Sequence, residues 1–412
     1  MSKKSIIYVF FFLISILHNP QFMYAQTIQI DNDLTTKYIS KKIFSSKTRA
    51  NVPEASSIQF GTDVSSRKVS SRLALNMTNG KNSVLLDDSY LKYKFKLSEI
   101  GFGKIARKWS FSPNESLAIS KNSAPINSIY FKIRTNKVSQ YRLFSWIGPW
   151  SFEVFNGLTN VDRGPDEAML LGTRAVIEPA KKFKIEFIQM AQWGGIGNET
   201  GINGLASAFL GNTNEGPTAH INRMAGIGFS YHLPKKFNAF RIYGQAIGED
   251  EAGSLPSCFM HLAGIEWDGQ LLSKNLTLIL EKIDTRIDVT AHGFCGSNTA
   301  YNNFEYSYTH NGKVMGASID TEGTSLELSA MLKISSPLSL ELSLKDIVIN
   351  DNNWDLHRLS TQRERGFVNT AALIWSKDML STEVGISYQN LNLDKVNYKK
   401  GTNVYMSASI VF

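Results

Sequence analysis

Long apolar runs are missing from most of this sequence, and their absence excludes one class of membrane protein. After residue 25 the chain has no uninterrupted apolar stretch of the roughly 18 residues that a membrane-spanning helix needs. Proline is scarce, at 11 residues against 30 glycines, and charged residues make up 19%, below the usual value of about 25%. Hydrophobic residues still reach 42%, which excludes a disordered chain. This composition is typical of many strands joined by tight turns.

The first 25 residues read as an export signal. Lys3 and Lys4 precede an apolar run from Ile6 to Leu17, and Ala25 before Gln26 offers a cleavage site. The formal charge of +8 includes these two lysines, so removing them leaves a mature chain of +6. An exported basic protein favours anionic glycans or lipid head groups as partners and excludes nucleic acid.

Cysteine is nearly absent as well. The two cysteines, Cys258 and Cys295, can form one disulfide in an oxidising compartment, with two free thiols as the alternative. Neither stands near the cleavage site, so we expect no lipid-anchored form.

Strict alternation of apolar and polar residues is the strongest local pattern. In one segment, Leu338, Leu340, Leu342 and Leu344 alternate with Ser339, Glu341, Ser343 and Lys345. A period of two places each set on one face of a strand. We count about 18 such candidate strands and no long amphipathic helix. They lie near 55–62, 68–78, 90–97, 127–134, 141–155, 169–177, 183–192, 221–232, 238–248, 258–267, 275–285, 303–310, 313–319, 325–334, 338–349, 366–376, 379–390 and 402–412.

The fold class that follows is all-β, a transmembrane antiparallel outer-membrane β-barrel of about 18 strands. A barrel of this size is too wide for apolar side chains to fill, so its apolar face must point into lipid. The last strand ends on Phe412 with apolar residues at every second place before it, as in the assembly signal of such barrels. We expect a signal peptide at 1–25, a periplasmic segment at 26–54 and the barrel at 55–412, inserted by the barrel assembly machinery into outer-membrane lipid and lipopolysaccharide.

The connections between the expected strands fall into two interleaved sets. Because the carboxyl end of such a barrel lies in the periplasm, short connections should alternate with long extracellular ones. The short set is 180–182, 234–236, 311–312, 335–337 and 377–378, and the long set includes 98–126, 156–168, 193–220, 286–302 and 350–365. This asymmetry favours a membrane barrel over a soluble sandwich.

Motifs of catalysis and cofactor binding are largely missing. The segment Gly101–Ala106 loosely fits a dinucleotide-binding loop but lacks a following helix, and there is no P-loop and no H-E-x-x-H. Carboxylates gather at Glu249-Asp250-Glu251 and at Asp162, Asp166 and Glu167. We read them as solvated loop charges, with calcium binding and glycoside hydrolysis as the alternatives. We therefore expect no enzyme activity, no cofactor and no metal.

Two groups of residues are candidates for holding a glycan. Lys92, Lys94 and Lys96 form a positive row on one strand face, which would attract uronic-acid carboxylates or be balanced by neighbouring acids. Aromatic rings, on which sugars stack, gather in the long connections. They are Trp109, Phe111, Trp193, Tyr301 and Trp354, and aromatic girdles at the membrane interface explain such rings equally well.

Several segments together resemble the Wzi family of capsule-assembly proteins. The segment from Trp109-Ser110-Phe111 to Ala124-Pro125 is similar to the family's tryptophan and L-x-x-S-x-N-A-x-P region. Further similar segments follow in the same order: Asn160-Val161-Asp162-Arg163, Leu171-Gly172-Thr173-Arg174, Gln192-Trp193-Gly194-Gly195, Tyr243-Gly244-Gln245, Glu249-Asp250-Glu251, Gly264-Ile265-Glu266, and Tyr301 to Gly316 with Asp320. The sequence lacks a helical pattern for the periplasm-side helices that members of this family often carry.

The resemblance implies a monomeric barrel of about 18 strands that binds capsular polysaccharide at the cell surface and helps attach it, as a lectin and not an enzyme. Long loops would make the contacts, with Arg163, Trp193, Asp250 and Trp109 as first candidates. Two alternatives stay open. One is a porin or specific channel in which the lysine row sets anion preference, and the other is a surface hydrolase.

Overall fold

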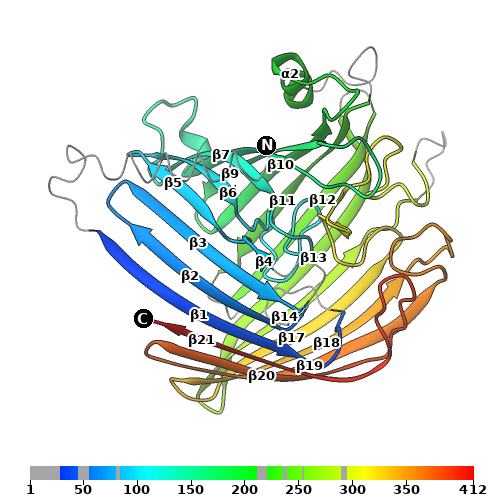
Figure 1. Cartoon of the computed structure of the whole chain (residues 1–412). Helices are drawn as coiled ribbons and strands as arrows, with labels where there is room; N and C mark the ends of the chain where they lie inside the picture. Colours follow the sequence, from blue (N-terminus) through cyan, green and yellow to red (C-terminus); the bar gives the residue numbers. More distant parts are fainter. Residues whose placement is uncertain are drawn as a thin grey trace.

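The computed structural model describes residues 28–44, 55–79, 84–210, 220–234, 239–252, 255–288 and 295–412. The expected signal peptide and most of segment 40–54 lie outside these ranges. Long antiparallel strands dominate, each pairing with its neighbours in the chain (Figure 1). In order they are β1 (Gln29–Ile39), β2 (Ser57–Ser65), β3 (Val69–Thr78), β5 (Tyr90–Lys94), β6 (Ser98–Lys104), β7 (Asn127–Thr135), β8 (Trp150–Leu158), β9 (Met169–Ala180), β10 (Phe183–Trp193), β11 (Asn222–His232), β12 (Phe240–Ala252), β13 (Leu255–Leu271), β14 (Lys274–Asp284), β17 (Thr324–Lys333), β18 (Leu338–Ile349), β19 (Glu364–Lys377), β20 (Leu380–Gln389) and β21 (Gly401–Val411).

The sheet closes on itself through its first and last strands. β1 pairs antiparallel with β21 from Asp33↔Val411 to Ile39↔Tyr405, and it pairs with β2 on its other side. Figure 1 shows β1 and β21 side by side at this seam. Beyond the short β4 (Val84–Leu85), which pairs only with the end of β3, the described residues supply 18 strands to the ring. The predicted fold, an 18-stranded antiparallel barrel of the outer-membrane type, is confirmed.

The predicted and observed numbers of strands agree only because two wall strands were missed and two predicted strands lie outside the wall. Residues 26–54 were expected to precede the barrel, but β1 is a wall strand. β6 is also a wall strand, although it was expected to be part of a long loop. β1 escaped notice because polar residues, Asn32 and Thr36, interrupt the apolar residues of its outward face and weaken the alternation. β6 escaped because it contains two glycines, and a Cβ at Gly101 would come within 2.3 Å of the Tyr130 ring.

The predicted strands 303–310 and 313–319 are not wall strands. Their Asn311-Gly312 turn does form a hairpin, but only β15 (Thr309–His310) and β16 (Lys313–Val314) pair, in a separate two-stranded sheet. Both faces of this hairpin are buried, with Tyr308, Met315 and Ala317 at most 1% exposed. Because the hairpin is packed on both faces, its sequence resembles that of a strand although it is not part of the barrel wall. The turn at 311–312 therefore belongs to a long connection and not to the short set.

Alternation along the strands separates a lipid-facing surface from a polar interior. Leu326 and Leu328 on β17 and Leu344 on β18 are about half exposed, whereas Ser329 and Glu341 on the opposite face are buried at 1% and 4%. The apolar face therefore points outward, as a transmembrane barrel requires. Within the described ranges, no helix has the length and hydropathy needed to cross a membrane.

Short and long connections alternate around the rim, as the sequence predicted. The chain turns within four residues at 334–337 and within two at 272–273 on the side where β1 begins and β21 ends. The opposite side carries the long connections 105–126, 159–168, 194–221, 285–323 and 350–363. Two connections depart from this pattern. The 136–149 connection lies on the short side and contains η2 (Ser145–Ile147), and on the long side only two residues separate β12 from β13. We call the long side the outer side, following the rule for such barrels.

Candidate functional site

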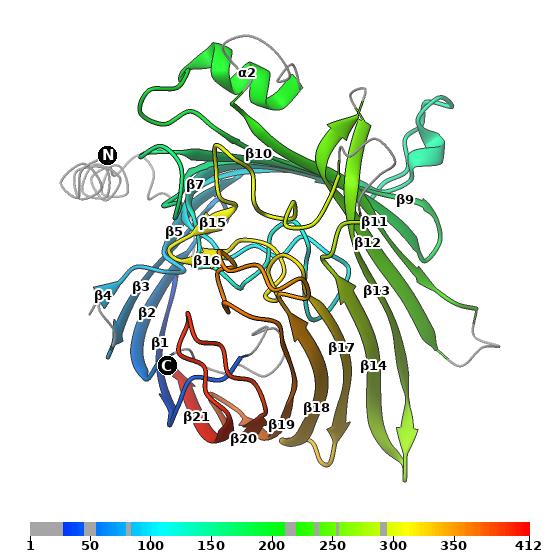
Figure 2. The same ribbon diagram turned by 90° about the vertical axis from the view of Figure 1, so that its right-hand side faces the viewer.

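Two of the outer connections fold back into the barrel. Figure 2 shows 105–126 and residues 295–323 inside the ring of strands. We call 105–126 the plug and residues 295–323 the inner lobe. Gln245 on β12 fixes the plug to the wall, since its Nε2 donates to Trp109 O (2.7 Å) and its Oε1 accepts from Leu117 N (2.8 Å). The lumen of this barrel is thus occupied by ordered chain.

Hydrogen bonds join the plug to the inner lobe. The hydroxyls of Tyr301 and Tyr308 donate to the carbonyls of Leu117 (2.7 Å) and Ala118 (2.8 Å). Ser120 N donates to Met315 O at 2.8 Å. Because these groups are all buried, each bond satisfies a donor or acceptor that would otherwise be costly to leave unpaired. The two segments behave as one packed body inside the barrel.

A buried lysine connects this body to the wall. Lys345 on β18 is 5% exposed, and its Nζ lies 3.5 Å from Glu115 Oε1 in the plug and 3.7 Å from Glu327 Oε2 on β17. Ser318 of the inner lobe donates to Glu115 Oε1 at 2.5 Å. Burial raises the pKa of Glu115 above its usual value, and the Lys345 ammonium and the Ser318 hydroxyl offset only part of this rise. Such a pair is costly to break by removing one partner, because the other charge stays buried.

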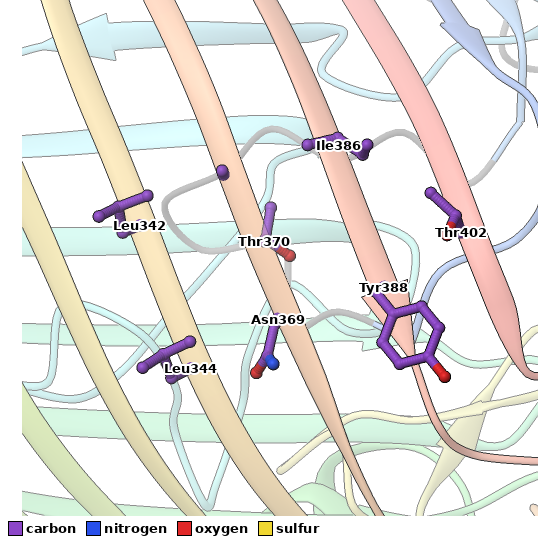
Figure 3. A pocket seen from close by; sticks show the side chains of 8 residues that line it. Leu342, Leu344, Asn369, Thr370, Ile386, Tyr388 and Thr402 are labelled. Atoms are coloured by element: carbon purple, nitrogen blue, oxygen red, sulfur yellow. The ribbon is translucent and has the colours of Figure 1, made fainter.

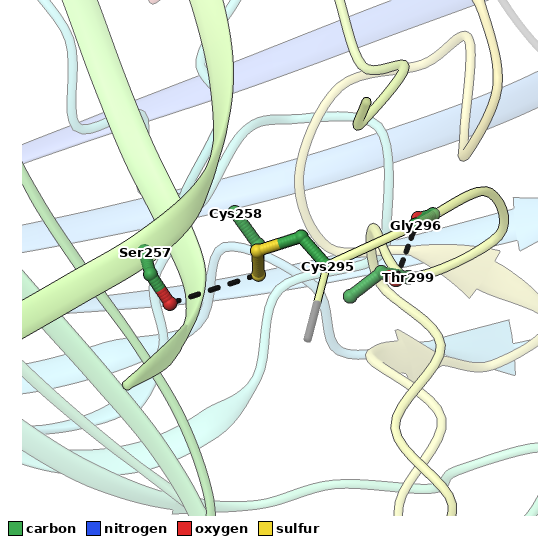
Figure 4. The surroundings of a disulfide bond; sticks show 5 residues. All are labelled: Ser257, Cys258, Cys295, Gly296 and Thr299. Carbon is green, nitrogen blue, oxygen red and sulfur yellow. Dashed lines mark hydrogen bonds between the residues drawn. A yellow bond between two sulfur atoms is a disulfide. The ribbon is translucent and has the colours of Figure 1, made fainter. Parts of the chain in front are cut away.

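A disulfide holds the inner lobe to the barrel wall. Cys258 at the outer end of β13 bonds Cys295 at the start of the lobe, with a Cα–Cα distance of 5.3 Å (Figure 4). This is the one pairing that the sequence allowed. The other end of the lobe continues directly into β17. Both ends of the lobe are therefore attached to the wall.

The inner lobe and the 159–168 connection together carry an exposed polar platform with one aromatic ring on the outer side of the barrel. We define this outer platform as Asn160, Arg163, Asn303, Phe304 and Asn311. Phe304 is 87% exposed. The Arg163 guanidinium donates to Asn303 O (2.6 Å) and to the Asn302 side chain (3.0 Å), which extends it across the lobe.

The outer platform is held by a ladder of backbone contacts between two loops. Arg163 N donates to Ser307 Oγ (3.0 Å), Ser307 N to Arg163 O (2.9 Å) and Asn311 N to Asn160 O (2.9 Å). Asn160 N donates to His310 Nδ1 at 3.0 Å, which requires that nitrogen to be unprotonated. Burial lowers the pKa of His310 to about 4, so the imidazole stays neutral at physiological pH. These bonds hold the loop of Arg163 and the inner lobe against each other.

The residues predicted to bind a glycan divide into three positions. Arg163 is exposed on the outer platform. Trp109 and Trp193 are each 3% exposed, so the structure does not support either ring as a stacking surface. Trp109 of the plug packs edge-on against Phe155 on β8 of the wall, and Trp193 Nε1 donates to Asn156 Oδ1 at 3.0 Å. Both are structural rings whose burial came from long-range packing.

The lysine row lies at the opposite rim. Lys92 and Lys94 are on β5 and Lys96 is in the short turn to β6, so all three are near the inner end of the barrel. Lys92 Nζ lies 4.5 Å over the ring of Tyr90, and Lys94 stands opposite Glu99. The row therefore does not share a surface with Arg163. The Asp250 side chain lies outside the described residues.

Carboxylates and other rings are also dispersed. Among the residues that the structure describes, no three His, Cys, Asp or Glu side chains gather closely enough to hold a metal ion. Asp162, Asp166 and Glu167 are exposed in the loop that carries Arg163. Tyr301 is fully buried in the inner lobe. Phe304 was missed because it fell inside an expected strand; the signal available was a lone aromatic between Asn303 and Glu305.

A depression lies on the lipid-facing exterior of the barrel, away from the outer platform. Leu342, Leu344, Ile386 and Tyr388 line it, across β18 to β20, together with Asn369, Thr370, Ala371 and Thr402 (Figure 3). The four large side chains are 38–54% exposed on the lipid-facing side of the barrel. Acyl chains of the bilayer face this depression, so it is no site for a polysaccharide.

Comparison with known proteins gives the family. The model of the family "Capsule assembly protein Wzi" matches residues 30–404, nearly the whole described barrel. The chain belongs to the Wzi family.

Solved structures share the fold of this Wzi-family chain. The structure is similar to Wzi of Escherichia coli, described as an outer membrane carbohydrate-binding β-barrel involved in group 1 capsule assembly, with a TM-score of 0.79 and 20% identity over 92% of this chain and 84% of that one. It also resembles the outer membrane protein OprD of Pseudomonas aeruginosa, with a TM-score of 0.55 and 10% identity over 93% of each chain. At these identities the likeness concerns the fold.

A curated protein matches part of the sequence. An uncharacterized 55.8 kDa protein in the cps region of Klebsiella pneumoniae is 26% identical over 204 residues, which span 49% of this Wzi-family chain and 40% of that protein. The match thus covers about two fifths of the relative's length.

Proposed function

We propose that this Wzi-family barrel binds capsular polysaccharide at its outer platform, in the outer membrane, and attaches the polymer to the cell surface. The observation that carries the proposal is the rigid platform itself. It offers an exposed aromatic ring, a fixed guanidinium and three side-chain amides on a surface that the disulfide and the loop ladder hold in place.

The chemistry of the platform suits a charged sugar chain. A sugar ring stacks its C–H face on Phe304, Arg163 pairs with a carboxylate, and the amides of Asn160, Asn303 and Asn311 bond hydroxyls. Each contact is weak, and a repeating polymer gains avidity because neighbouring units rebind at high effective concentration. The protein works as a monomer, with no chemical step.

A capsule-retention assay tests the proposal. In a strain lacking the gene, wild-type protein should restore cell-attached capsule, and the double variant R163A/F304A should release polymer into the medium. Leu356→Ala is the matched control, since Leu356 is 65% exposed on another outer connection and outside the platform. Equal retention by the double variant and the control would refute the platform as the binding site.

The channel alternative makes the opposite demand on the lumen. A porin needs a continuous aqueous path, whereas here the plug and the inner lobe pack inside the ring. Purified protein in planar bilayers should give no steady current. An anion-selective current that falls when Lys92, Lys94 and Lys96 are changed to glutamine would favour the channel instead. Incubation with purified polymer should likewise produce no new reducing ends, which tests the hydrolase alternative.

A further inference from the structure

A short helix lies outside the barrel, against its lipid-facing wall. α2 (Ile202–Leu210) is part of the outer connection 194–221 and lies over the outer end of β10 (Figure 2). Gly204 and Ala208 are the buried residues of the helix, and a Cβ at Gly204 would come within 3.1 Å of the Trp193 ring. Gln189 Nε2 on β10 donates to the carbonyls of Ala208 (3.0 Å) and Phe209 (3.1 Å).

The wall beneath α2 is the surface that elsewhere contacts lipid. Alternate residues of β10 point outward, and the outward side chain of Phe187 is 47% exposed. Two and six positions further along the same face, Gln189 and Trp193 are covered by the helix instead. Helix α2 therefore replaces lipid over the outer end of β10, directly above a part of the wall that remains lipid-exposed.

The helix presents three distinct faces. At about 100° per residue, Gly204 and Ala208 share the face against the wall. A second arc, open to the surroundings, holds four large apolar side chains. These are Ile202, Leu205, Phe209 and Leu210, which are 85%, 37%, 45% and 77% exposed. Asn203 and Ser207 form the third, narrow arc, and the helix has no charged residue.

We propose that α2 lies in the outer leaflet of the membrane at the lipid–water boundary. Its apolar arc faces the acyl chains, and Asn203 and Ser207 face the head groups, as in interfacial amphipathic helices. Lipid is the occupant because the apolar arc continues the lipid-facing surface of β10, beginning at Phe187. The small residues Gly204 and Ala208 allow close packing on the wall.

The helix is also connected to the outer platform. Ile196 N donates to Asp166 O (2.8 Å), and the Tyr306 hydroxyl donates to Gly194 O (2.8 Å) and accepts from Asn198 Nδ2 (2.9 Å). These bonds join the segment before α2 to the loop of Arg163 and to the inner lobe. A helix fixed in the leaflet thereby sets the height of the platform above the membrane. Lipid contact does not depend on glycan binding, so the two proposals can fail separately.

Single-cysteine labelling of the full-length barrel tests this position. Both native cysteines form the disulfide, so a new cysteine is the only free thiol. We would introduce Leu205→Cys, Leu210→Cys, Asn203→Cys and, as a platform control, Phe304→Cys. Each variant would carry an environment-sensitive dye and be reconstituted into liposomes of phosphatidylcholine with or without bromine on the acyl chains. Folding would be checked by heat-modifiable gel mobility.

We expect the dyes at Leu205 and Leu210 to shift to shorter wavelength and to lose most of their fluorescence to brominated lipid. The dye at Asn203 should be quenched less, and the dye at Phe304 not at all. Equal water exposure at all four sites would overturn the proposal. Disulfide-linked dimers formed by Leu210→Cys in place of lipid quenching would also overturn it, because they would show that a second copy covers the helix.

Discussion

Replacing Cys258 and Cys295 by serine should loosen the inner lobe while leaving the barrel wall intact. The cysteines are 37 residues apart, but most of that chain is the β13–β14 hairpin, in which His261 pairs with Asp284. With the wall folded, the disulfide therefore closes a free loop of only about 15 residues. The chain-entropy estimate for such a loop is about 3 kcal/mol.

This magnitude sets the expected size of the effect. A loss of about 3 kcal/mol from the local opening free energy raises the open population of the lobe by roughly a hundredfold. The contacts of Tyr301 and Tyr308 with the plug remain, so the lobe should stay folded most of the time.

Hydrogen exchange on the protein in lipid nanodiscs measures the opening. Peptides from 299–321 should exchange about a hundredfold faster in the double serine variant and in reduced wild-type protein. Peptides from β17 and β18 serve as the internal control and should be unchanged. Unaltered exchange in 299–321 would show that the plug contacts alone hold the lobe, and the reasoning would fail.

Three further outcomes follow from the same structure. Lys345→Ala leaves Glu115 buried without its ammonium, so the plug should lose about 3–5 kcal/mol, reduced if Glu115 takes up a proton, and conductance bursts should appear in planar bilayers where wild type shows none. Because burial lowers the pKa of His310 from 6.5 to about 4, the neutral form is the one compatible with the fold. The platform loops should have their full stability above about pH 6.5, and this stability should fall by up to about 1.4 kcal/mol per pH unit down to about pH 4. His310→Asn keeps an acceptor for Asn160 and should abolish this pH dependence. Hydrogen exchange measured as a function of pH tests both outcomes. Phe304→Ala should weaken binding of a capsule oligosaccharide by about 1 kcal/mol, near fivefold in Kd by calorimetry, and an unchanged Kd would remove the ring from the site.

The wall of the barrel was predictable because its pattern is local. Leucines at every second position of β18 meet lipid whatever the rest of the chain does, and turns such as 334–337 interrupt the pattern at fixed places. The prediction failed where a wall strand alternates only weakly, and where a segment outside the wall shows the same alternation. β1 carries polar Asn32 and Thr36 on its outward face and was read as a tail, whereas the buried hairpin at 309–314 alternates like a strand without being in the wall.

The candidate site was less predictable, since exposure depends on distant contacts. Trp109 and Arg163 both lie in long connections and looked equally available. Gln245 on β12 draws the first into the lumen, and Asn303 in the inner lobe holds the second at the surface. Neither contact leaves a mark in the local sequence.

The sequence by itself determined the architecture: alternation with a period of two and unequal connections specify a closed barrel with an apolar exterior. The tertiary structure decided what the interior and the loops do. A polar inner face is compatible with water or with packed chain, and only pairings such as Lys345 with Glu115 choose between them. The physical reason is that lipid imposes a regular pattern on every strand, whereas the lumen is filled by contacts between residues far apart in the chain.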